Sequence, residues 1–305
     1  MPWYEVLDKE ISDYLPDLKV LKEEPMAAHT SFRIGGPARR MAFPATLEEM
    51  VLLVNFARDC GAQPLIIGNG TNLLVTDQGI DRLVINTRHM DLLEQDGGKN
   101  EIKAGAGVSL ARLALFAMEN GLSGLEFAHG IPGSVGGGVT MNAGAYGGEL
   151  KDVLSGAGIL FPDSGVRYLN TDELRLSYRH SILTDCPDAV VLYAVFRLQN
   201  GKKDIIKSKM DELMVRRKES QPLEYPSAGS FFKRPEGHFA GALIEQNGGK
   251  GMQVGDARIS QKHAGFLINT GNATFGDVIS LMKKIQKIVW EKDGVMLEPE
   301  VRIIS

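Results

Sequence analysis

The sequence contains very few cysteines and no long apolar run. Cys60 and Cys186 are the only two cysteines among 305 residues, and neither has a partner at metal-binding spacing. No apolar run approaches the roughly 18 residues that a membrane-spanning helix needs. The first residues, MPWYEVLDKEISDYL, are acidic and amphipathic, unlike a secretory signal. These absences predict a cytoplasmic protein with free, buried or half-buried cysteines, no metal site and no membrane association.

The charge balance argues against a nucleic-acid partner. The net charge is −4 and no basic block occurs, so the electrostatic attraction that drives non-specific nucleic-acid binding is missing. A hydrophobic content of 43% and a charged content of 24% are ordinary for a globular protein. A chain of 305 residues is long enough for two or three domains.

The familiar phosphate-binding and hydrolase fingerprints are also missing. Gly68-x-Gly70 begins like a dinucleotide fingerprint, but Leu73 stands at the third glycine position. Gly105-x-Gly107 fails in the same way, and no G-x-x-x-x-G-K occurs. Rossmann-type and P-loop folds are therefore not expected. Ser230 lacks a G-x-S-x-G setting, which argues against a hydrolase nucleophile.

Glycine is concentrated in one stretch. Gly130–Glu149 reads GIPGSVGGGVTMNAGAYGGE, in which eight of twenty residues are glycine. Because glycine loses the most backbone entropy on folding, such density needs a structural reason. The apolar residues among the glycines argue against a flexible linker. We expect an ordered loop whose backbone N–H groups surround a ligand; a purely structural turn is the alternative. A second glycine loop, Gly68–Asn72, follows a predicted strand.

Hydrophobic periodicity and helix caps predict mixed helices and strands, and therefore an α+β fold. Thr46 and Glu49 form a predicted capping box, and Ser109 is a predicted N-cap. Helices are predicted over residues 3–15, 46–61, 110–120, 204–218, 240–246 and 274–291. Strands are predicted over residues 20–24, 39–43, 64–68, 82–86, 101–105, 153–161, 189–198, 265–269 and 295–304.

Three polar side chains have the chemistry of an active site. Arg179 suits a carboxylate or phosphate, because its guanidinium matches two oxygens. Ser230 can donate a proton if it is held against a developing carbanion, and apolar neighbours around Glu300 favour a raised carboxyl pKa. A surface ion pair, an ordinary loop serine and a salt bridge to Arg302 are the respective alternatives. His129 and His263 lack a second metal ligand at useful spacing.

Taken together, the motifs resemble the UDP-N-acetylenolpyruvoylglucosamine reductase family. The resemblance runs from about residue 25 to 304, and the phrases IPGSVGGGVTMNAGAYGGE, PSAGSFFKRP and KHAGFLIN are specific in combination. The stretches that carry it are His29–Ala38, Gly68–Asn72, Gly130–Glu149, Leu176–Ser181, Ala228–Pro235 and Leu297–Ile303.

The resemblance implies a two-subdomain FAD-binding fold of the vanillyl-alcohol-oxidase (PCMH) type over about residues 33–199, followed by an α+β substrate-binding domain. The implied boundaries are 1–86, 87–203 and 204–305, with the last strand returning to the first subdomain. The FAD is expected to be non-covalent, so His129 stays uncoupled. The implied FAD-binding residues are Gly68, Asn69, Gly70, Thr71, Asn72, Gly130, Ile131, Pro132, Gly133, Ser134, Gly136, Gly137, Asn142 and Ala143.

The resemblance also implies an oxidoreductase of peptidoglycan precursor synthesis. NADPH reduces FAD, and the reduced flavin then reduces UDP-N-acetyl-enolpyruvylglucosamine to UDP-N-acetylmuramate with ping-pong kinetics. Ser230 is the implied proton donor, while Arg179 and Glu300 stabilise the enolate. The implied substrate-binding residues are Tyr146, Tyr178, Lys218, Lys233 and His263.

The spacing of the implied catalytic residues bears on the subtype. Only 51 positions separate Arg179 from Ser230, which is similar to the shorter subtype of the family, without an inserted loop carrying a tyrosine. A monomer is expected. Two alternatives stay open: an FAD-dependent oxidase with the same cofactor fold, and a non-catalytic nucleotide-binding module.

Overall fold

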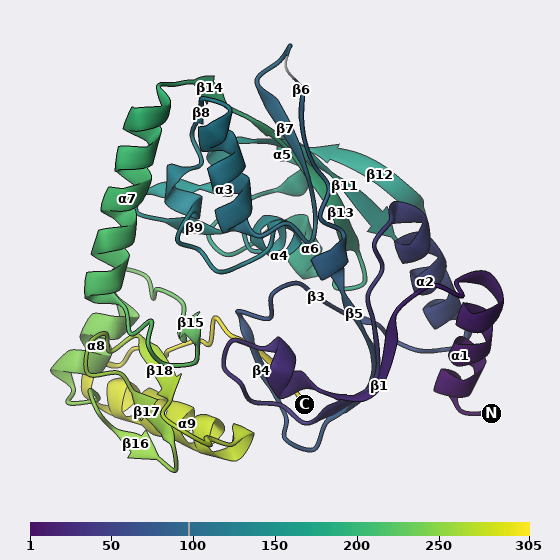
Figure 1. The fold of residues 1–305 in the computed structure, drawn as a ribbon. Helices are drawn as coiled ribbons and strands as arrows, with labels where there is room; N and C mark the ends of the chain where they lie inside the picture. The colour runs from purple at the N-terminus through teal and green to yellow at the C-terminus, as the bar shows by residue number, and fades with distance from the viewer. Residues whose placement is uncertain (97) are drawn as a thin grey trace. The chain divides into compact units, whose positions relative to one another are not determined.

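The computed structural model describes residues 1–96 and 98–305, which divide into two compact units (Figure 1). Unit 1 consists of Met1–Lys22, Arg39–Asn69 and Arg82–Val215. Unit 2 consists of Glu23–Ala38, Gly70–Asp81 and Arg216–Ser305. Each unit is therefore built from segments far apart in the sequence. The predicted boundaries at residues 86 and 203 stay a prediction.

The first part of unit 1 packs two helices beside a four-stranded sheet of order β1-β2-β5-β3. Its elements are α1 (Trp3–Tyr14), β1 (Val20–Pro25), β2 (Pro37–Ala42), α2 (Leu47–Asp59), β3 (Leu65–Ile67) and β5 (Ile80–Asn86). Thr46 and Glu49 form the expected capping box at the start of α2. The buried side chains of Leu7, Leu53 and Leu83 belong to one apolar core, which holds the helices on the sheet.

The second part of unit 1 contains a five-stranded antiparallel sheet of order β12-β11-β13-β7-β6. Its strands are β6 (Leu93–Asp96), β7 (Glu101–Gly105), β11 (Leu154–Phe161), β12 (Gly165–Asn170) and β13 (Val190–Arg197). Its helices are α3 (Leu110–Glu119), α4 (Val135–Thr140), α5 (Thr171–Leu174) and α6 (Ile182–Asp185). The short elements are β8 (Leu122–Ser123), β9 (Gly144–Ala145), β10 (Gly148–Glu149), β14 (Gln199–Asn200) and the 3-10 turns η2 (Thr87–His89), η3 (Glu126–Ala128) and η4 (Leu150–Asp152).

Unit 2 has its own four-stranded sheet, of order β15-β18-β17-β16, and a separate parallel pair, β19-β4. Its elements are the 3-10 turn η1 (Met26–His29), β4 (Leu73–Val75), β15 (Ser227–Ser230), α8 (Ala240–Gln246), β16 (Gln253–Val254), β17 (Ala257–Ile259), β18 (Phe266–Asn269), α9 (Phe275–Asp293) and β19 (Arg302–Ile304). Helix α7 (Lys203–Ser220) begins in unit 1 and ends in unit 2. Phe32 and Phe231 are fully buried in the core of unit 2, with ring centroids 6.5 Å apart.

Most predicted elements are present within a residue or two, but two predictions differ from the structure. Residues 295–304 were expected to form one strand, yet only Arg302–Ile304 does, because this is the part that pairs with β4. A short helix, α4, interrupts the predicted glycine loop. The polar stretch around Arg179 lies between two short helices, α5 and α6.

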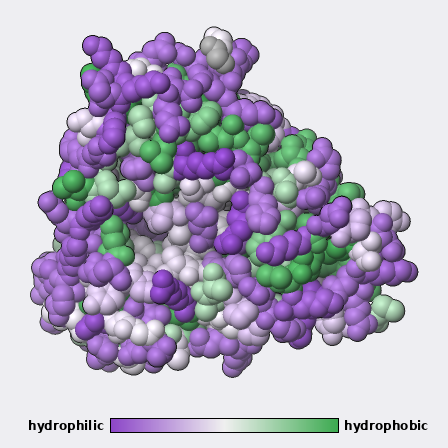
Figure 2. All heavy atoms as spheres, viewed as in Figure 1, coloured by the Kyte–Doolittle hydropathy of each residue, from purple (hydrophilic) through white to green (hydrophobic). Residues whose placement is uncertain are grey.

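Hydrophilic residues dominate the visible face of the molecule, and apolar residues appear there as separate patches (Figure 2). Among the described residues, no helix combines the length and the apolar character that a membrane crossing requires.

Candidate active site

The glycine-rich stretch is ordered, and part of its glycine content serves packing. The backbone N–H groups of Val135 and Gly136 donate to the carbonyls of Val108 and Ala106, at 2.8 and 2.9 Å. A Cβ added to Gly136 would lie 3.1 Å from the Cβ of Ala106. Glycine at this position therefore lets α4 approach the chain just beyond β7 closely. These two N–H groups are already bonded within the protein.

The two predicted glycine loops meet within unit 1. The Asn69 side chain donates to the carbonyl of Pro132 at 2.8 Å. A Cβ added to Gly68 would lie 1.9 Å from Ser134 Oγ. Ser134 is 2% exposed, and its hydroxyl has no hydrogen-bond partner among the described residues. A buried hydroxyl without a partner is costly unless a ligand satisfies it. Ser134 fills the space that a side chain at residue 68 would need, and its unpartnered hydroxyl fits a polar ligand such as the predicted FAD.

The second half of the Gly68–Asn72 loop belongs to unit 2. Gly70 has φ +62°, and a Cβ there would lie 2.0 Å from the carbonyl oxygen of His29. Asn72 bonds the C-terminal segment twice: its side chain donates to the Glu300 carbonyl at 3.1 Å, and its own carbonyl accepts from Arg302 N–H at 3.0 Å. Thr71, half-buried, lies between them. The predicted cofactor loop is thus tied to the segment that carries Glu300.

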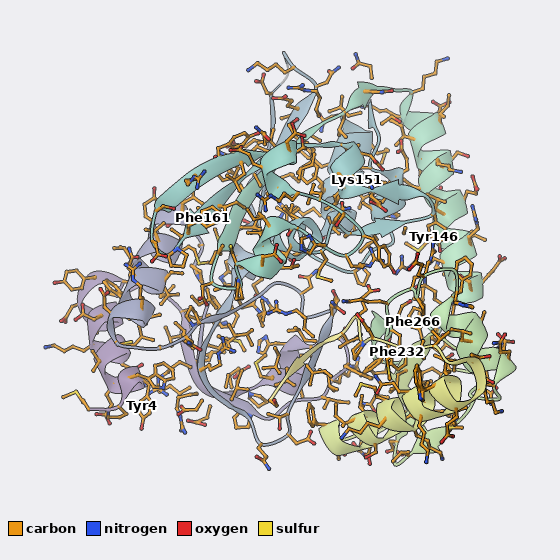
Figure 3. All side chains as sticks on the ribbon, turned by 180° about the vertical axis from the view of Figure 1, so that it is seen from behind. Tyr4, Tyr146, Lys151, Phe161, Phe232 and Phe266 are labelled. Atoms are coloured by element: carbon orange, nitrogen blue, oxygen red, sulfur yellow. The ribbon has the colours of Figure 1, made fainter. Side chains whose placement is uncertain are left out.

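The structure brings Ser230 and Glu300 onto adjacent segments of unit 2. Ser230 is exposed at the end of β15 and pairs with Phe266 across a register shift. The shift contains Gly229 at φ +79°, as expected of a β-bulge, a feature that is common next to active sites. Glu300 N–H donates to the carbonyl of Phe231, the residue after Ser230, at 2.9 Å. Figure 3 labels Phe266, the strand partner of Ser230, and Phe232, whose ring lies 5.3 Å from that of Phe231. The half-buried Glu300 and the exposed Ser230 are therefore held by neighbouring backbone.

Arg179 lies in a strained turn of unit 1. Ser177 and His180 exchange backbone hydrogen bonds of 3.1 and 3.2 Å around Tyr178 and Arg179. Arg179 has φ +55°, a left-handed conformation that usually requires glycine or asparagine in a turn. Its guanidinium lies 5.3 Å from the ring centroid of the exposed Tyr178. Strain of this kind persists where the surroundings impose it, and it is found most often at functional sites.

Tyr146 occupies a similar conformation in the hairpin between β9 and β10. Ala145 pairs with Gly148, so Tyr146 and Gly147 form a two-residue turn, with φ values of +54° and +88°. Both positive values indicate a type I′ turn, in which a tyrosine is unusual. Tyr146 is 37% exposed, and Figure 3 shows it on the segment that leads to Lys151. The ring of Tyr146 is therefore carried by the tip of this hairpin and is partly exposed.

The predicted substrate-side residues have unequal environments. Lys218 is exposed near the end of α7, and its carbonyl accepts from Lys262 Nζ at 2.5 Å. Lys233 Nζ lies 3.3 Å from Glu298 Oε2. His263 Nδ1 accepts from Gly265 N–H at 3.1 Å. Burial lowers the pKa of His263 below its ordinary value, so this side chain is held neutral. Lys218 is exposed to anions, Lys233 is ion-paired with Glu298 at the surface, and His263 is a neutral donor through Nε2.

The remaining predicted FAD residues lie around α4. Ile131 and Ala143 pack against the core of unit 1, and their N–H groups donate to Ala128 and Gly138 at 3.0 and 2.8 Å. The Asn142 side chain is buried, with both Nδ2 hydrogens donated to protein groups and one N–H accepted by Oδ1, and its contact with the flavin stays a prediction. Gly130, Pro132, Gly133 and Gly137 line the same stretch.

The remaining predictions concern the two cysteines and metal binding. Cys60 and Cys186 are half-buried free thiols, as expected, and burial raises the pKa of Cys60. Within residues 1–96 and 98–305, no group of three histidine, cysteine, aspartate or glutamate side chains is placed to hold a metal ion.

Comparison with known proteins identifies the two parts of the chain. Residues 38–169 match a sequence profile described as an FAD binding domain, and residues 221–304 match the UDP-N-acetylenolpyruvoylglucosamine reductase C-terminal domain. The UDP-N-acetylenolpyruvoylglucosamine reductase of Agathobacter rectalis is 51% identical, covering 97% of this chain and 98% of its own. That of Caldanaerobacter subterraneus subsp. tengcongensis is 47% identical, covering 99% of both chains.

The comparison of structures agrees. The crystal structure of UDP-N-acetylenolpyruvylglucosamine reductase from Thermus caldophilus superimposes with a TM-score of 0.79 at 35% identity, covering 94% of this chain and 99% of the other. The predicted α+β fold with an FAD-binding domain and a C-terminal domain is confirmed. The chain therefore belongs to the UDP-N-acetylenolpyruvoylglucosamine reductase family.

Proposed function

We propose that this FAD-dependent oxidoreductase reduces the enolpyruvyl ether of UDP-N-acetylglucosamine to UDP-N-acetylmuramate with NADPH, a step of peptidoglycan precursor synthesis. The observation that carries the proposal is the 51% identity to a reductase of this name over 97% of the chain. A cytoplasmic location, a monomeric state and membership of the shorter subtype stay predictions.

The glycine loops would hold FAD. Ser134 Oγ supplies a buried donor without a protein partner, and the space beside Gly68 is closed to any side chain. The hydrogen bond from the Asn69 side chain to the Pro132 carbonyl holds the two glycine loops together. When bound, FAD accepts a hydride from NADPH and delivers one to the methylene carbon of the substrate.

Side chains of the protein would stabilise the developing negative charge and supply the proton. Hydride addition places negative charge on the carbon and carboxylate oxygens next to the methylene group. Arg179 would pair with those oxygens, and a protonated Glu300 would donate to them. Ser230 would give a proton to the neighbouring carbon. Donors that are already in position when charge develops contribute most to catalysis. The strain at Arg179 and the bulge before Ser230 support such roles.

The substrate-side contacts follow from charge. Lys218 and Lys233 are exposed cations suited to a diphosphate. Tyr146 and Tyr178, with 37% and 47% exposure, offer ring faces to a nucleotide or sugar. His263 would donate a hydrogen bond without adding charge.

The test measures the rates of the two half-reactions separately, in the wild type and in Ser230→Ala. Under anaerobic conditions NADPH is expected to bleach the flavin equally fast in both proteins. Reoxidation by the enolpyruvyl substrate is expected to slow by about 10²–10⁴ in the variant, the usual contribution of a positioned proton donor. A variant that is defective only in flavin reduction would contradict the role of Ser230.

The same measurements test the alternatives. Rapid reoxidation of the wild type by oxygen, without reoxidation by the enolpyruvyl substrate, would indicate an oxidase. Purified protein without visible flavin absorbance after addition of FAD would indicate a non-catalytic nucleotide-binding module.

A further inference from the structure

Asn142 makes three side-chain hydrogen bonds to protein groups. It is 1% exposed and adopts φ +41°, which asparagine tolerates better than most residues. Its Nδ2 donates to Glu149 Oε2 at 2.9 Å and to the Ser177 carbonyl at 3.0 Å. Its Oδ1 accepts from Lys151 N–H at 3.0 Å. One buried side chain thus joins the end of α4 to the start of the turn that carries Arg179.

Ser181 makes the matching connection at the other end of the turn. It is fully buried, and its hydroxyl donates to the Thr140 carbonyl at 2.7 Å. The same oxygen accepts from Leu183 N–H at 3.2 Å and caps α6. Thr140 is the last residue of α4. Both ends of the turn at 177–180 are therefore attached to the C-terminal end of one short helix.

The opposite end of α4 belongs to the glycine loop. Ser134, with its unpartnered buried hydroxyl, is the N-cap residue of this helix. A helix of six residues is about 9 Å long, and α4 packs against β13 and β7. A single rigid element thus has the candidate flavin contacts at one end and the strained arginine turn at the other.

Because Arg179 has an unfavourable backbone conformation, its turn needs to be held at both ends. A left-handed conformation is unfavourable for a residue with a side chain, so an unrestrained turn would relax and move the guanidinium. Hydrogen bonds at both ends of the turn oppose this relaxation. Glu149 adds a fixed negative charge: the Lys151 ammonium lowers its pKa most, and Asn142 and the charge of Arg179 lower it further.

We infer that Asn142 and Ser181 are positioning residues that hold Arg179 in its left-handed conformation by anchoring both ends of its turn to the end of α4. The inference rests on the proposed function of Arg179, and it gives Asn142 a role in addition to the predicted contact with FAD. The action is expected in the half-reaction that needs Arg179, namely reoxidation of reduced flavin by the enolpyruvyl substrate.

The first test measures both half-reactions for Ser181→Ala, with Thr46→Ala as the matched control. Thr46 is also an N-cap in unit 1, at the start of α2. Ser181→Ala is expected to retain bound FAD and to be reduced by NADPH within about twofold of the wild type. Its reoxidation by substrate is expected to slow at least tenfold, since small misplacements of a catalytic group cost one to two orders of magnitude. Thr46→Ala is expected to change neither rate.

The second test is a double-mutant cycle with Arg179→Ala. If Ser181 acts through Arg179, adding Ser181→Ala to Arg179→Ala slows reoxidation by less than twofold. A full tenfold further loss, or equal losses in both half-reactions, would overturn the inference. Should Ser181→Ala fold poorly, Asn142→Asp carries the same cycle. An unchanged reoxidation rate in Arg179→Ala alone would instead refute the proposed role of Arg179.

Discussion

Gly70→Ala should disrupt the cofactor loop because two physical costs coincide at this position. Gly70 has φ +62°, and an added Cβ would lie 2.0 Å from the carbonyl oxygen of His29 and 3.1 Å from Thr30 Cα. The Gly70 carbonyl also accepts from Ser31 N–H at 3.1 Å. The obstructing atoms are backbone, so no side-chain rotation relieves the overlap. The loop must move by more than about 1 Å to restore an ordinary contact.

The expected loss of stability is the sum of two costs, and a matched control variant separates them. The left-handed backbone alone costs alanine about 1–2 kcal/mol. Overpacking against a fixed neighbour adds typically about 1–3 kcal/mol, so Gly70→Ala is expected to lower the free energy of unfolding by about 2–5 kcal/mol. Gly237 has φ +72° in the same unit, with no atom within 4 Å of an added Cβ. Gly237→Ala therefore isolates the backbone cost.

Urea unfolding of the flavin-free proteins measures the stability difference, and titration with FAD measures the effect on the loop. Gly70→Ala is expected to weaken FAD binding at least tenfold, because Thr71 and Asn72 move with the displaced backbone. Gly237→Ala should bind FAD like the wild type. Equal stability losses in the two variants, or unchanged FAD affinity in Gly70→Ala, would refute the steric argument.

Three further predictions concern stability. Thr46→Ala removes a hydroxyl that accepts from Glu49 N–H at 3.1 Å, and denaturant unfolding should show a loss of about 1 kcal/mol. Asp8→Asn breaks the 2.7 Å pair with the buried Arg40, and should cost about 2 kcal/mol at neutral pH. The hydrogen bond from Arg40 lowers the pKa of Asp8, so this contribution is present above about pH 4 and is lost as pH falls through the folded-state pKa. For His263, burial lowers the pKa, so the unfolded state binds the proton more readily; stability should fall below about pH 6.5, and less steeply in His263→Gln. Parallel pH profiles of the variants and the wild type would contradict both linkage arguments.

Local signals in the sequence were sufficient for most of the fold. The capping box at Thr46 and the N-cap at Ser109 both appear where they were predicted, because such contacts depend on residues only three positions apart. The glycine density of Gly130–Glu149 correctly indicated an ordered segment. It did not indicate α4, since glycine disfavours helices and only packing against the neighbouring strands makes a helix favourable there.

The environments of the site residues depended on long-range contacts that no local pattern contains. Asn142 is predicted to contact FAD because of its motif, and no local pattern indicated that its side chain also bonds Glu149, Ser177 and Lys151. Ser181 lies inside a recognised motif but was assigned no role. The positive φ of Arg179 was equally invisible, because nothing in its sequence neighbourhood resembles a glycine turn.

Backbone hydrogen bonds, more than long side chains, set the register of the candidate site in unit 2. The Asn72 side chain donates to the Glu300 carbonyl at 3.1 Å, and the Asn72 carbonyl accepts from Arg302 N–H at 3.0 Å. Glu300 in turn donates to Phe231 at 2.9 Å, next to Ser230. The short parallel pair of β4 and β19 continues this register into the core. A slip of one residue would turn Glu300 to the opposite face, so the pairing of β4 with β19 also fixes the side on which Glu300 lies. Hydrogen bonds to backbone carbonyls act similarly in unit 1, where residues at the C-terminal end of α4 hold both ends of the Arg179 turn.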